Sequence, residues 1–226
     1  MHPPSLIIFD CDGVLVDSEP VSNRVVASEL TRLGWAMTPE EADTRFLGMT
    51  FPDMVPVIEA QLQRTLPDSW RDDLIGELMN RMAEEVEPIP GALAALHGVS
   101  ALGLPWRIAS NSSHREMAVK FRRIGIEALA AGRIHSFEDV ARGKPAPDLF
   151  LAAAAAEGIA PSATLVIEDS VTGARAAAAA GMACLGYAPH GDNPRLRETG
   201  AFLFDDMHTL PALISAQGRK FFASFL

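Results

Sequence analysis

Apolar runs that end abruptly in polar residues recur along the chain. The first covers residues 6–9 and ends at Asp10-Cys11-Asp12-Gly13. Such a run is typical of a strand that is buried on both faces of a parallel sheet and carries polar residues at its carboxyl end. The same pattern predicts further strands at residues 106–109, 164–167 and 183–185, with shorter candidates at 202–204 and around Ile134.

Helical stretches separate these runs, and they cover residues 113–124, 147–157, 171–180 and 207–216. Three of the stretches are followed directly by a glycine, which commonly ends a helix because it adopts the left-handed conformation without steric cost. The alternation predicts an α/β fold, with a Rossmann-like parallel sheet covered by helices on both faces. Ligands of such sheets bind at the carboxyl ends of the strands, where the polar residues fall.

Residues 17–86 interrupt this alternation, because they contain helix signals without a convincing strand. Thr38 and Glu41 have the spacing of a capping box, and Thr50 and Asp53 repeat it. A Pro-Ile-Pro-Gly segment then follows the region and ends its last helix. The pattern predicts an all-helical domain at 17–86, the cap, which is inserted after the first strand of an α/β core made of residues 1–16 and 87–226.

Composition and charge limit the classes of partner and substrate that this chain can have. The 226 residues are 48% apolar, which is enough to bury a substantial core. The net charge of -10 argues against nucleic acid or an anionic membrane as a partner and favours a small diffusible substrate. Residues 17–86 hold 14 acids and 6 bases, a net charge of -8, so the cap carries most of the negative charge.

Two features indicate the compartment. The chain has only two cysteines, and its first residues lack the basic and apolar regions of a secretory leader. We therefore expect a reduced, cytoplasmic protein. No apolar run approaches the roughly 18 to 20 residues that a membrane-spanning helix needs, so no association with a membrane is expected.

Acidic pairs follow two of the predicted strands. Asp10 and Asp12 come after the first, and Glu168 and Asp169 end another. An Asp-x-Asp pair alone is equally well explained as a turn. Four carboxylates at one sheet edge, however, would repel one another unless a cation neutralised them. Ligands that are all oxygen suit Mg²⁺, which binds one or two carboxylates together with water and a phosphate oxygen.

Two further motifs point to an anionic substrate. Ser110-Asn111 ends a predicted strand just before a helix, where a hydroxyl and free backbone N–H groups can bind an anion, although plain helix capping explains the serine equally well. Lys144 stands in a Gly-Lys-Pro-Ala-Pro-Asp loop that two prolines stiffen. A lysine is usually only solvated, but a fixed one can stabilise a transferring phosphoryl group.

These motifs, in this order along the chain, resemble those of the haloacid dehalogenase superfamily of phosphotransferases. They are Asp10-Cys11-Asp12-Gly13, Ser110-Asn111, Gly143-Lys144-Pro145 and Glu168-Asp169. A helical insert directly after the first motif resembles the subfamily of beta-phosphoglucomutase and phosphoglycolate phosphatase. The resemblance implies an enzyme that hydrolyses a small phosphorylated metabolite, such as a sugar or polyol monophosphate.

The resemblance also implies a role for each motif residue. Asp10 would attack phosphorus and form an aspartyl phosphate, and Asp12 would protonate the leaving oxygen and then deprotonate the attacking water. Ser110 would hydrogen-bond a phosphoryl oxygen, and Lys144 would offset its charge. The implied cofactor is Mg²⁺, on a carboxylate oxygen of Asp10, the backbone carbonyl of Asp12 and the carboxylate of Asp169, with Glu168 as a ligand or as a group that orients the ligands.

Alternatives within the family differ in the acceptor of the phosphoryl group. Dehalogenation is excluded, because Asp12 would have no task when the leaving group is halide. A phosphomutase is disfavoured, because Ser22 and Phe51 stand where its pattern would have histidine and arginine. A catalytically silent binding protein is the third hypothesis. For the oligomeric state, the sequence is compatible with both a monomer and a homodimer. The expected substrate contacts are Asn111, Ser18, Arg45 and Thr50.

Overall fold

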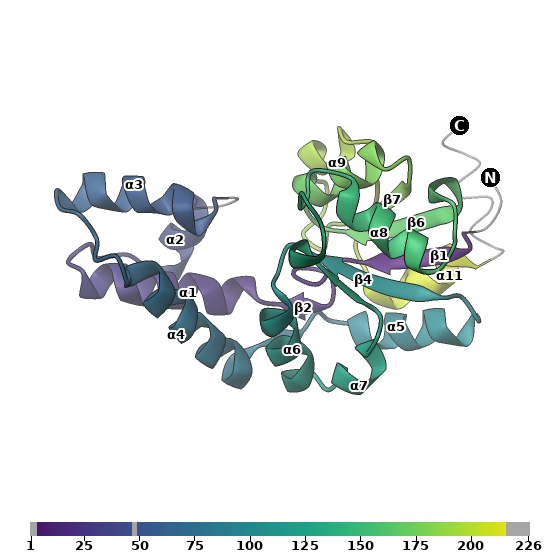
Figure 1. Cartoon of the computed structure of the whole chain (residues 1–226), viewed down its shortest axis with the longest axis horizontal. Coiled ribbons are helices and arrows are strands. Elements are labelled where there is room, and N and C mark those ends of the chain that lie inside the picture. Colours follow the sequence, from purple (N-terminus) through teal and green to yellow (C-terminus); the bar gives the residue numbers. More distant parts are fainter. Residues whose placement is uncertain (1–3, 47–48, 216–226) are drawn as a thin grey trace. The chain divides into compact units, whose positions relative to one another are not determined.

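The strands predicted from the sequence all belong to one parallel sheet. In the computed structural model, which describes residues 4–46 and 49–215, the strand order is β5-β4-β1-β6-β7-β8 (Figure 1). The strands are β1 (Leu6–Phe9), β4 (Trp106–Ser110), β5 (Ile134–Ser136), β6 (Thr164–Glu168), β7 (Ala183–Tyr187) and β8 (Phe202–Phe204). The predicted Rossmann-like α/β fold is thereby confirmed.

Helices cover both faces of this sheet. The core contains α5 (Ala92–Ala101), α6 (His114–Arg123), α7 (Glu127–Ala130), α8 (Asp148–Ala156), α9 (Val171–Ala179), α10 (Pro194–Arg197) and α11 (Leu210–Ile214). It also contains the 3-10 turns η1 (Phe137–Asp139), η2 (Pro161–Ala163) and η3 (Met207–Thr209). In Figure 1, α8 and α9 lie on one face, and α5, α6 and α11 lie on the other.

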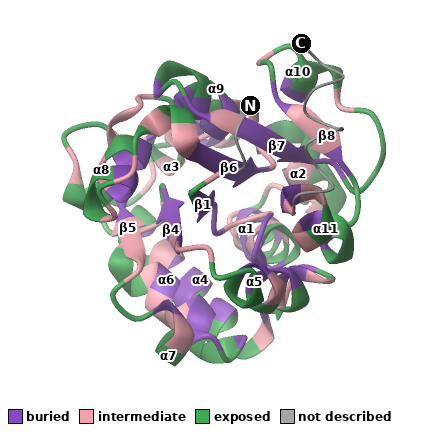
Figure 2. Ribbon diagram, turned by 90° about the vertical axis from the view of Figure 1, so that its right-hand side faces the viewer, coloured by how far each residue is buried: buried purple, intermediate pink, exposed green. Residues whose placement is uncertain are grey.

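The sheet is buried because both of its faces are covered. Every residue of β1 is fully buried, and Figure 2 shows β1, β6 and β7 largely in the colour of buried residues. Alanines of α8 and α9 pack against β1 and β6. Their small side chains let the helices approach the sheet closely, and the apolar surface removed from water there stabilises the fold by about 25 cal/mol per Å².

Two helical segments differ from the sequence prediction. The segment at residues 92–101 is almost uniformly apolar and shows little helical periodicity, so its pattern predicts no helix, yet it forms α5 with one face buried. The helix predicted at 207–216 is shorter and is divided into η3 and α11. Residue 216 lies outside the described residues.

A second compact unit, Ser18–Glu87, consists mainly of helices in its described residues and interrupts the first unit, which comprises Met1–Asp17 and Pro88–Leu226. Short strands β2 (Val16–Asp17) and β3 (Glu87–Pro88) pair where the chain passes between the units. The helical unit contains α1 (Glu19–Arg32), α2 (Pro39–Phe46), α3 (Phe51–Leu62) and α4 (Trp70–Glu85). Among the described residues, no helix has both the length and the apolar character needed to cross a membrane.

Both expected capping boxes are present in the helical unit. Thr38 Oγ1 accepts from the backbone N–H of Glu41, whose carboxylate accepts from the backbone N–H of Thr38. Thr50 and Asp53 make the same reciprocal pair at the start of α3. Each box satisfies two backbone donors that a helix start otherwise leaves without partners, which explains why these segments form helices.

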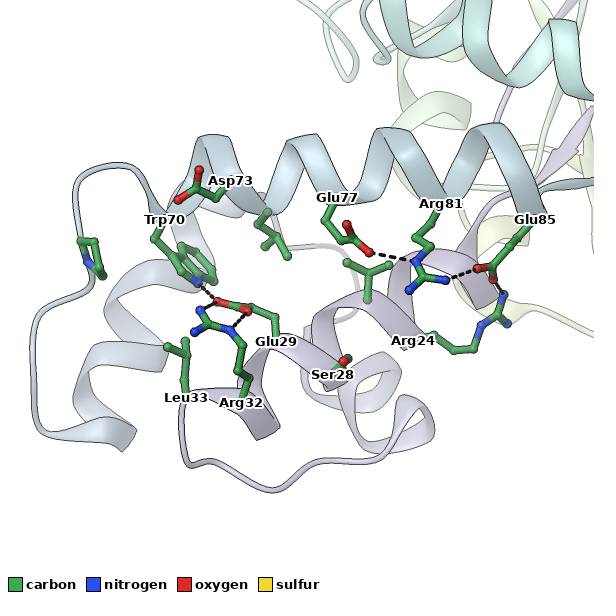
Figure 3. A pocket seen from close by; sticks show the side chains of 13 residues that line it. Arg24, Ser28, Glu29, Arg32, Leu33, Trp70, Asp73, Glu77, Arg81 and Glu85 are labelled. Atoms are coloured by element: carbon green, nitrogen blue, oxygen red, sulfur yellow. Dashed lines mark hydrogen bonds and ion pairs between the residues drawn. The ribbon is translucent and has the colours of Figure 1, made fainter.

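The helical unit also holds a cavity of about 590 Å³ between α1 and α4 (Figure 3). Trp70 Nε1 donates to Glu29, which also binds Arg32, and Arg81 joins Glu77 to Glu85. Because these charged groups already bind one another, the cavity presents paired charges rather than a site that calls for a ligand.

Candidate active site

Three neighbouring strands bring the predicted motifs together. In the register of the sheet, Phe9 of β1 lies opposite Ile108 of β4 on one side and Ile167 of β6 on the other. The residues that follow this level, Asp10, Ser110 and Glu168, therefore lie at the same carboxyl edge. All three are buried. Buried polar groups need partners in the protein, so their hydrogen bonds define the site.

Lys144 bridges the carboxylates of Asp10 and Glu168. Its Nζ lies 2.6 Å from Oδ1 of Asp10 and 2.7 Å from Oε1 of Glu168. Burial raises the pKa of Asp10 to about 7, against the opposing charge of Lys144 and with a further contribution from Glu168. Burial alone lowers the pKa of Lys144, but the two carboxylates outweigh it and raise that pKa above its usual value. The ammonium group therefore stays charged at this edge.

Asn111 holds the loop that carries Lys144. Its side-chain amide donates to the backbone carbonyl of Lys144 at 3.0 Å and accepts from the backbone N–H of Lys144 at 2.8 Å. Gly143 is needed beside this pair, because a Cβ atom there would lie 2.6 Å from Oδ1 of Asn111. Both polar groups of the Asn111 amide thus bind the loop, and the contact of Asn111 with a substrate stays a prediction.

Glu168 is more heavily hydrogen-bonded than the sequence suggested. Its Oε2 accepts from the backbone N–H groups of Asp169 and Ser170 and from the Ser170 hydroxyl, at 2.8 to 3.0 Å. Its Oε1 accepts from Lys144. Glu168 therefore fixes the turn between β6 and α9 while it orients the lysine. Gly173 makes room for this carboxylate, because a Cβ atom at that position would overlap it.

Three carboxylates at this edge could hold a cation. Asp10, Glu168 and Asp169 each offer an oxygen, and these atoms lie within 4.8 Å of one another. Gly13 has a φ of +74° and passes so close to Asp169 that a Cβ atom would overlap the carboxylate. A glycine here both permits the left-handed turn and leaves space for Asp169. A ligand set made only of carboxylate oxygens fits a hard divalent cation.

Asp12 has partners that sequence reasoning missed. Lys120 Nζ lies 2.7 Å from Oδ1 of Asp12, and the Ser112 hydroxyl donates to Oδ2 at 2.7 Å. The sequence contained a signal, since Lys120 falls on the apolar stripe of its helix with Met117 and Phe121. A lysine on a buried helix face needs a negative partner.

The residues expected in the cap all lie in the helical unit. The Thr50 hydroxyl is part of the capping box with Asp53. The Arg45 guanidinium lies 5.4 Å from the centre of the Trp35 ring, and Ser18 is buried beside the first turn of α1. The contacts of these three residues with a substrate stay predictions.

Comparison with known proteins gives the family. The family model described as haloacid dehalogenase-like hydrolase matches residues 4–181. Hexitol phosphatase A of Escherichia coli is 34% identical, over 87% of this chain and 88% of its own length. The 6-phosphogluconate phosphatase of the same organism is 27% identical, over 94% of this chain and 95% of its own length.

A solved structure agrees with these relatives. A HAD family hydrolase from Deinococcus radiodurans, with bound phosphate and sodium, is 32% identical and has a TM-score of 0.79, with coverage of 100% of this chain and 97% of that one. The likeness extends over both the core and the helical insert, as the resemblance of the motifs implied. This chain belongs to the haloacid dehalogenase-like hydrolase family.

Proposed function

We propose that this chain hydrolyses the phosphate ester of a small sugar or polyol through an aspartyl phosphate on Asp10. It is a phosphoric monoester hydrolase of its family, and the two relatives compared above are a hexitol phosphatase and a 6-phosphogluconate phosphatase. One observation carries the proposal. The buried carboxylate of Asp10 shares a sheet edge with a charged lysine, a buried serine and two further acids.

The reaction would proceed in two halves. First, a carboxylate oxygen of Asp10 attacks phosphorus, the ester P–O bond breaks, and the leaving oxygen takes a proton from Asp12. Second, a water oxygen attacks the phosphorus of the aspartyl phosphate, the bond to Asp10 breaks, and Asp12 takes the proton of that water. The products are the free alcohol and inorganic phosphate, and both aspartates return to their starting forms.

Ser110 and Lys144 would bind the phosphoryl group. Ser110 Oγ accepts from the backbone N–H of Ser112 at 3.0 Å, which leaves the Ser110 proton available to donate to a phosphoryl oxygen. Lys144 supplies a fixed positive charge next to the attacking oxygen. Phosphoryl transfer depends mostly on such positioning and charge stabilisation.

A divalent cation, Mg²⁺ in our proposal, would be held mainly by Asp10 and Asp169. Glu168 fits less well as a direct ligand, because Lys144 already binds one of its oxygens and three donors bind the other. The backbone carbonyl of Asp12 would add a further oxygen. A bound Mg²⁺ would supply positive charge that offsets the carboxylates and the incoming phosphate.

Phosphate release from a panel of substrates tests the proposal. We expect release from 6-phosphogluconate, hexitol phosphates and para-nitrophenyl phosphate in the presence of Mg²⁺, and loss of release with a chelator or with Asp10→Asn. Thermal unfolding provides a readout besides activity: Mg²⁺ should raise Tm, and Asp169→Asn should abolish that shift. No phosphate release from any ester with Mg²⁺ would overturn the proposal, and a preference for nucleotides or phosphopeptides would overturn the substrate class.

A further inference from the structure

Lysine is rare in this chain, and both lysines in the described part bind the first motif. The whole chain has 3 lysines against 16 arginines. Within residues 4–46 and 49–215 the lysines are Lys120 and Lys144, and each forms an ion pair with one aspartate of that motif. Lys144, which pairs with Asp10, belongs to one of the four motifs, whereas Lys120 belongs to none of them.

Lys120 and Ser112 hydrogen-bond the two oxygens of the Asp12 carboxylate. Lys120 Nζ donates to Oδ1 and the Ser112 hydroxyl donates to Oδ2, both at 2.7 Å, and Lys120 also donates to Ser112 at 3.1 Å. The three groups therefore close a ring of hydrogen bonds. Two attachment points prevent the carboxylate from rotating, which a single hydrogen bond does not do.

The two ends of the pair differ in exposure. The Lys120 side chain is 6% exposed, while that of Asp12 is 32% exposed. Burial by itself lowers the pKa of Lys120, but the charge of Asp12 and the hydrogen bond to it raise this pKa above its usual value. The lysine is thus a buried, charged anchor, and the carboxylate that it holds remains accessible.

The anchors are themselves fixed by neighbouring strands and by the helix start. The backbone N–H of Ser112 donates to Ser110, and its carbonyl accepts from the Ser136 hydroxyl at 2.8 Å. The following residue, Ser113, caps α6 through a capping box with Glu116. The ring around Asp12 therefore rests on the same strand end that carries Ser110.

We propose that Lys120 is a positioning residue for Asp12, which it holds, together with Ser112, in the orientation that accepts the proton of the attacking water. This inference rests on the proposed function. Both oxygens of Asp12 accept hydrogen bonds here, which favours the charged carboxylate, the form that takes the proton of water in the second half of the reaction. Removal of Lys120 would therefore slow the breakdown of the aspartyl phosphate more than its formation from an ester with a good leaving group.

Pre-steady-state kinetics of Lys120→Met test the inference. Nitrophenolate leaves without a proton, so Asp10 should still be phosphorylated by para-nitrophenyl phosphate. We expect a burst of nitrophenolate equal to the enzyme concentration, followed by turnover slowed by about 10- to 100-fold, with KM changed less than about threefold. Arg115→Met removes a cation from an exposed position of α6 and is the matched control, expected to behave like wild type.

A double-mutant cycle separates positioning from structural damage. If Lys120 acts through Asp12, then Lys120→Met should cost little in a protein that already carries Asp12→Asn. Losses that multiply in the double variant, or a Lys120→Met enzyme that resembles Arg115→Met and shows no burst, would overturn the inference. Wild type that releases no phosphate would instead overturn the proposed function, so the two failures are distinguishable.

Thermal unfolding shows whether Lys120→Met is folded. If it is not, a second variant tests the inference. Ser112→Ala removes the other attachment point of Asp12 and leaves the charges balanced. It should produce the same burst with a smaller decrease in turnover. If the burst amplitude and the turnover rate of Ser112→Ala equal those of wild type, the ring of hydrogen bonds does not position Asp12.

Discussion

Replacement of Gly173 by alanine sets two opposing effects against each other. Gly173 is the third residue of α9. Helix propensity favours alanine over glycine by about 1 kcal/mol, so an argument from sequence expects stabilisation. In the structure, however, the added Cβ atom would overlap the carboxylate of Glu168, which is fully buried and hydrogen-bonded through both oxygens.

The cost of the steric overlap should exceed the gain in helix propensity. Overpacking of a buried site costs about 1 to 3 kcal/mol. Displacement of Glu168 also weakens hydrogen bonds to a charged group, each worth about 1.5 to 3 kcal/mol. Set against the gain in propensity, the net destabilisation of Gly173→Ala is about 2 to 4 kcal/mol, which corresponds to a fall in Tm of roughly 5 to 15 °C. Phosphatase activity should fall at the same time, because Glu168 orients Lys144.

Thermal and urea unfolding, followed by circular dichroism, measure this effect. Gly76→Ala is the matched control, because Gly76 is exposed inside α4 and a Cβ atom there would meet nothing within 4 Å. It should stabilise the protein by about 0.5 to 1 kcal/mol. A Gly173→Ala protein that is as stable and as active as wild type would refute the packing argument.

Three further predictions concern the site and its surroundings. Asp10→Asn should lower kcat by at least about 10³-fold, because an amide cannot form the aspartyl phosphate; turnover near the wild-type rate would identify another nucleophile. Asn111→Ala should lower kcat by about tenfold with little change in KM, because it loosens the Lys144 loop; a raised KM at constant kcat would instead show direct substrate binding. Burial, with the charge of Arg107, lowers the pKa of His135 below its usual 6.5. The unfolded chain therefore binds the extra proton first, so stability should fall as pH drops below about 6.5. Urea unfolding of His135→Gln should show a smaller fall, and equal pH dependence in both proteins would contradict this assignment.

Much of the sheet edge follows from the order of residues along the chain. Continuous apolar runs that stop at an acid or a hydroxyl predict buried strands, and the carboxyl ends of parallel strands share one edge of the sheet. This pattern is enough to place Asp10, Ser110, Glu168 and Asp169 near one another. Capping boxes are equally local, since they need only residues three positions apart. The almost uniformly apolar α5 lacks both kinds of signal, so the residue pattern does not predict it.

The α/β fold, the helical insert and the set of carboxylates can all be inferred from the residue pattern, because they depend on local periodicity and on rules that hold for every parallel sheet. The hydrogen-bond partner of each polar atom cannot be inferred in this way, because it depends on tertiary packing. Lys120 lies 108 positions from Asp12, and Asn111 lies 33 positions before the loop that it holds. Such pairings arise from how helices and loops pack over the strand ends, and residue spacing along the chain does not encode that packing.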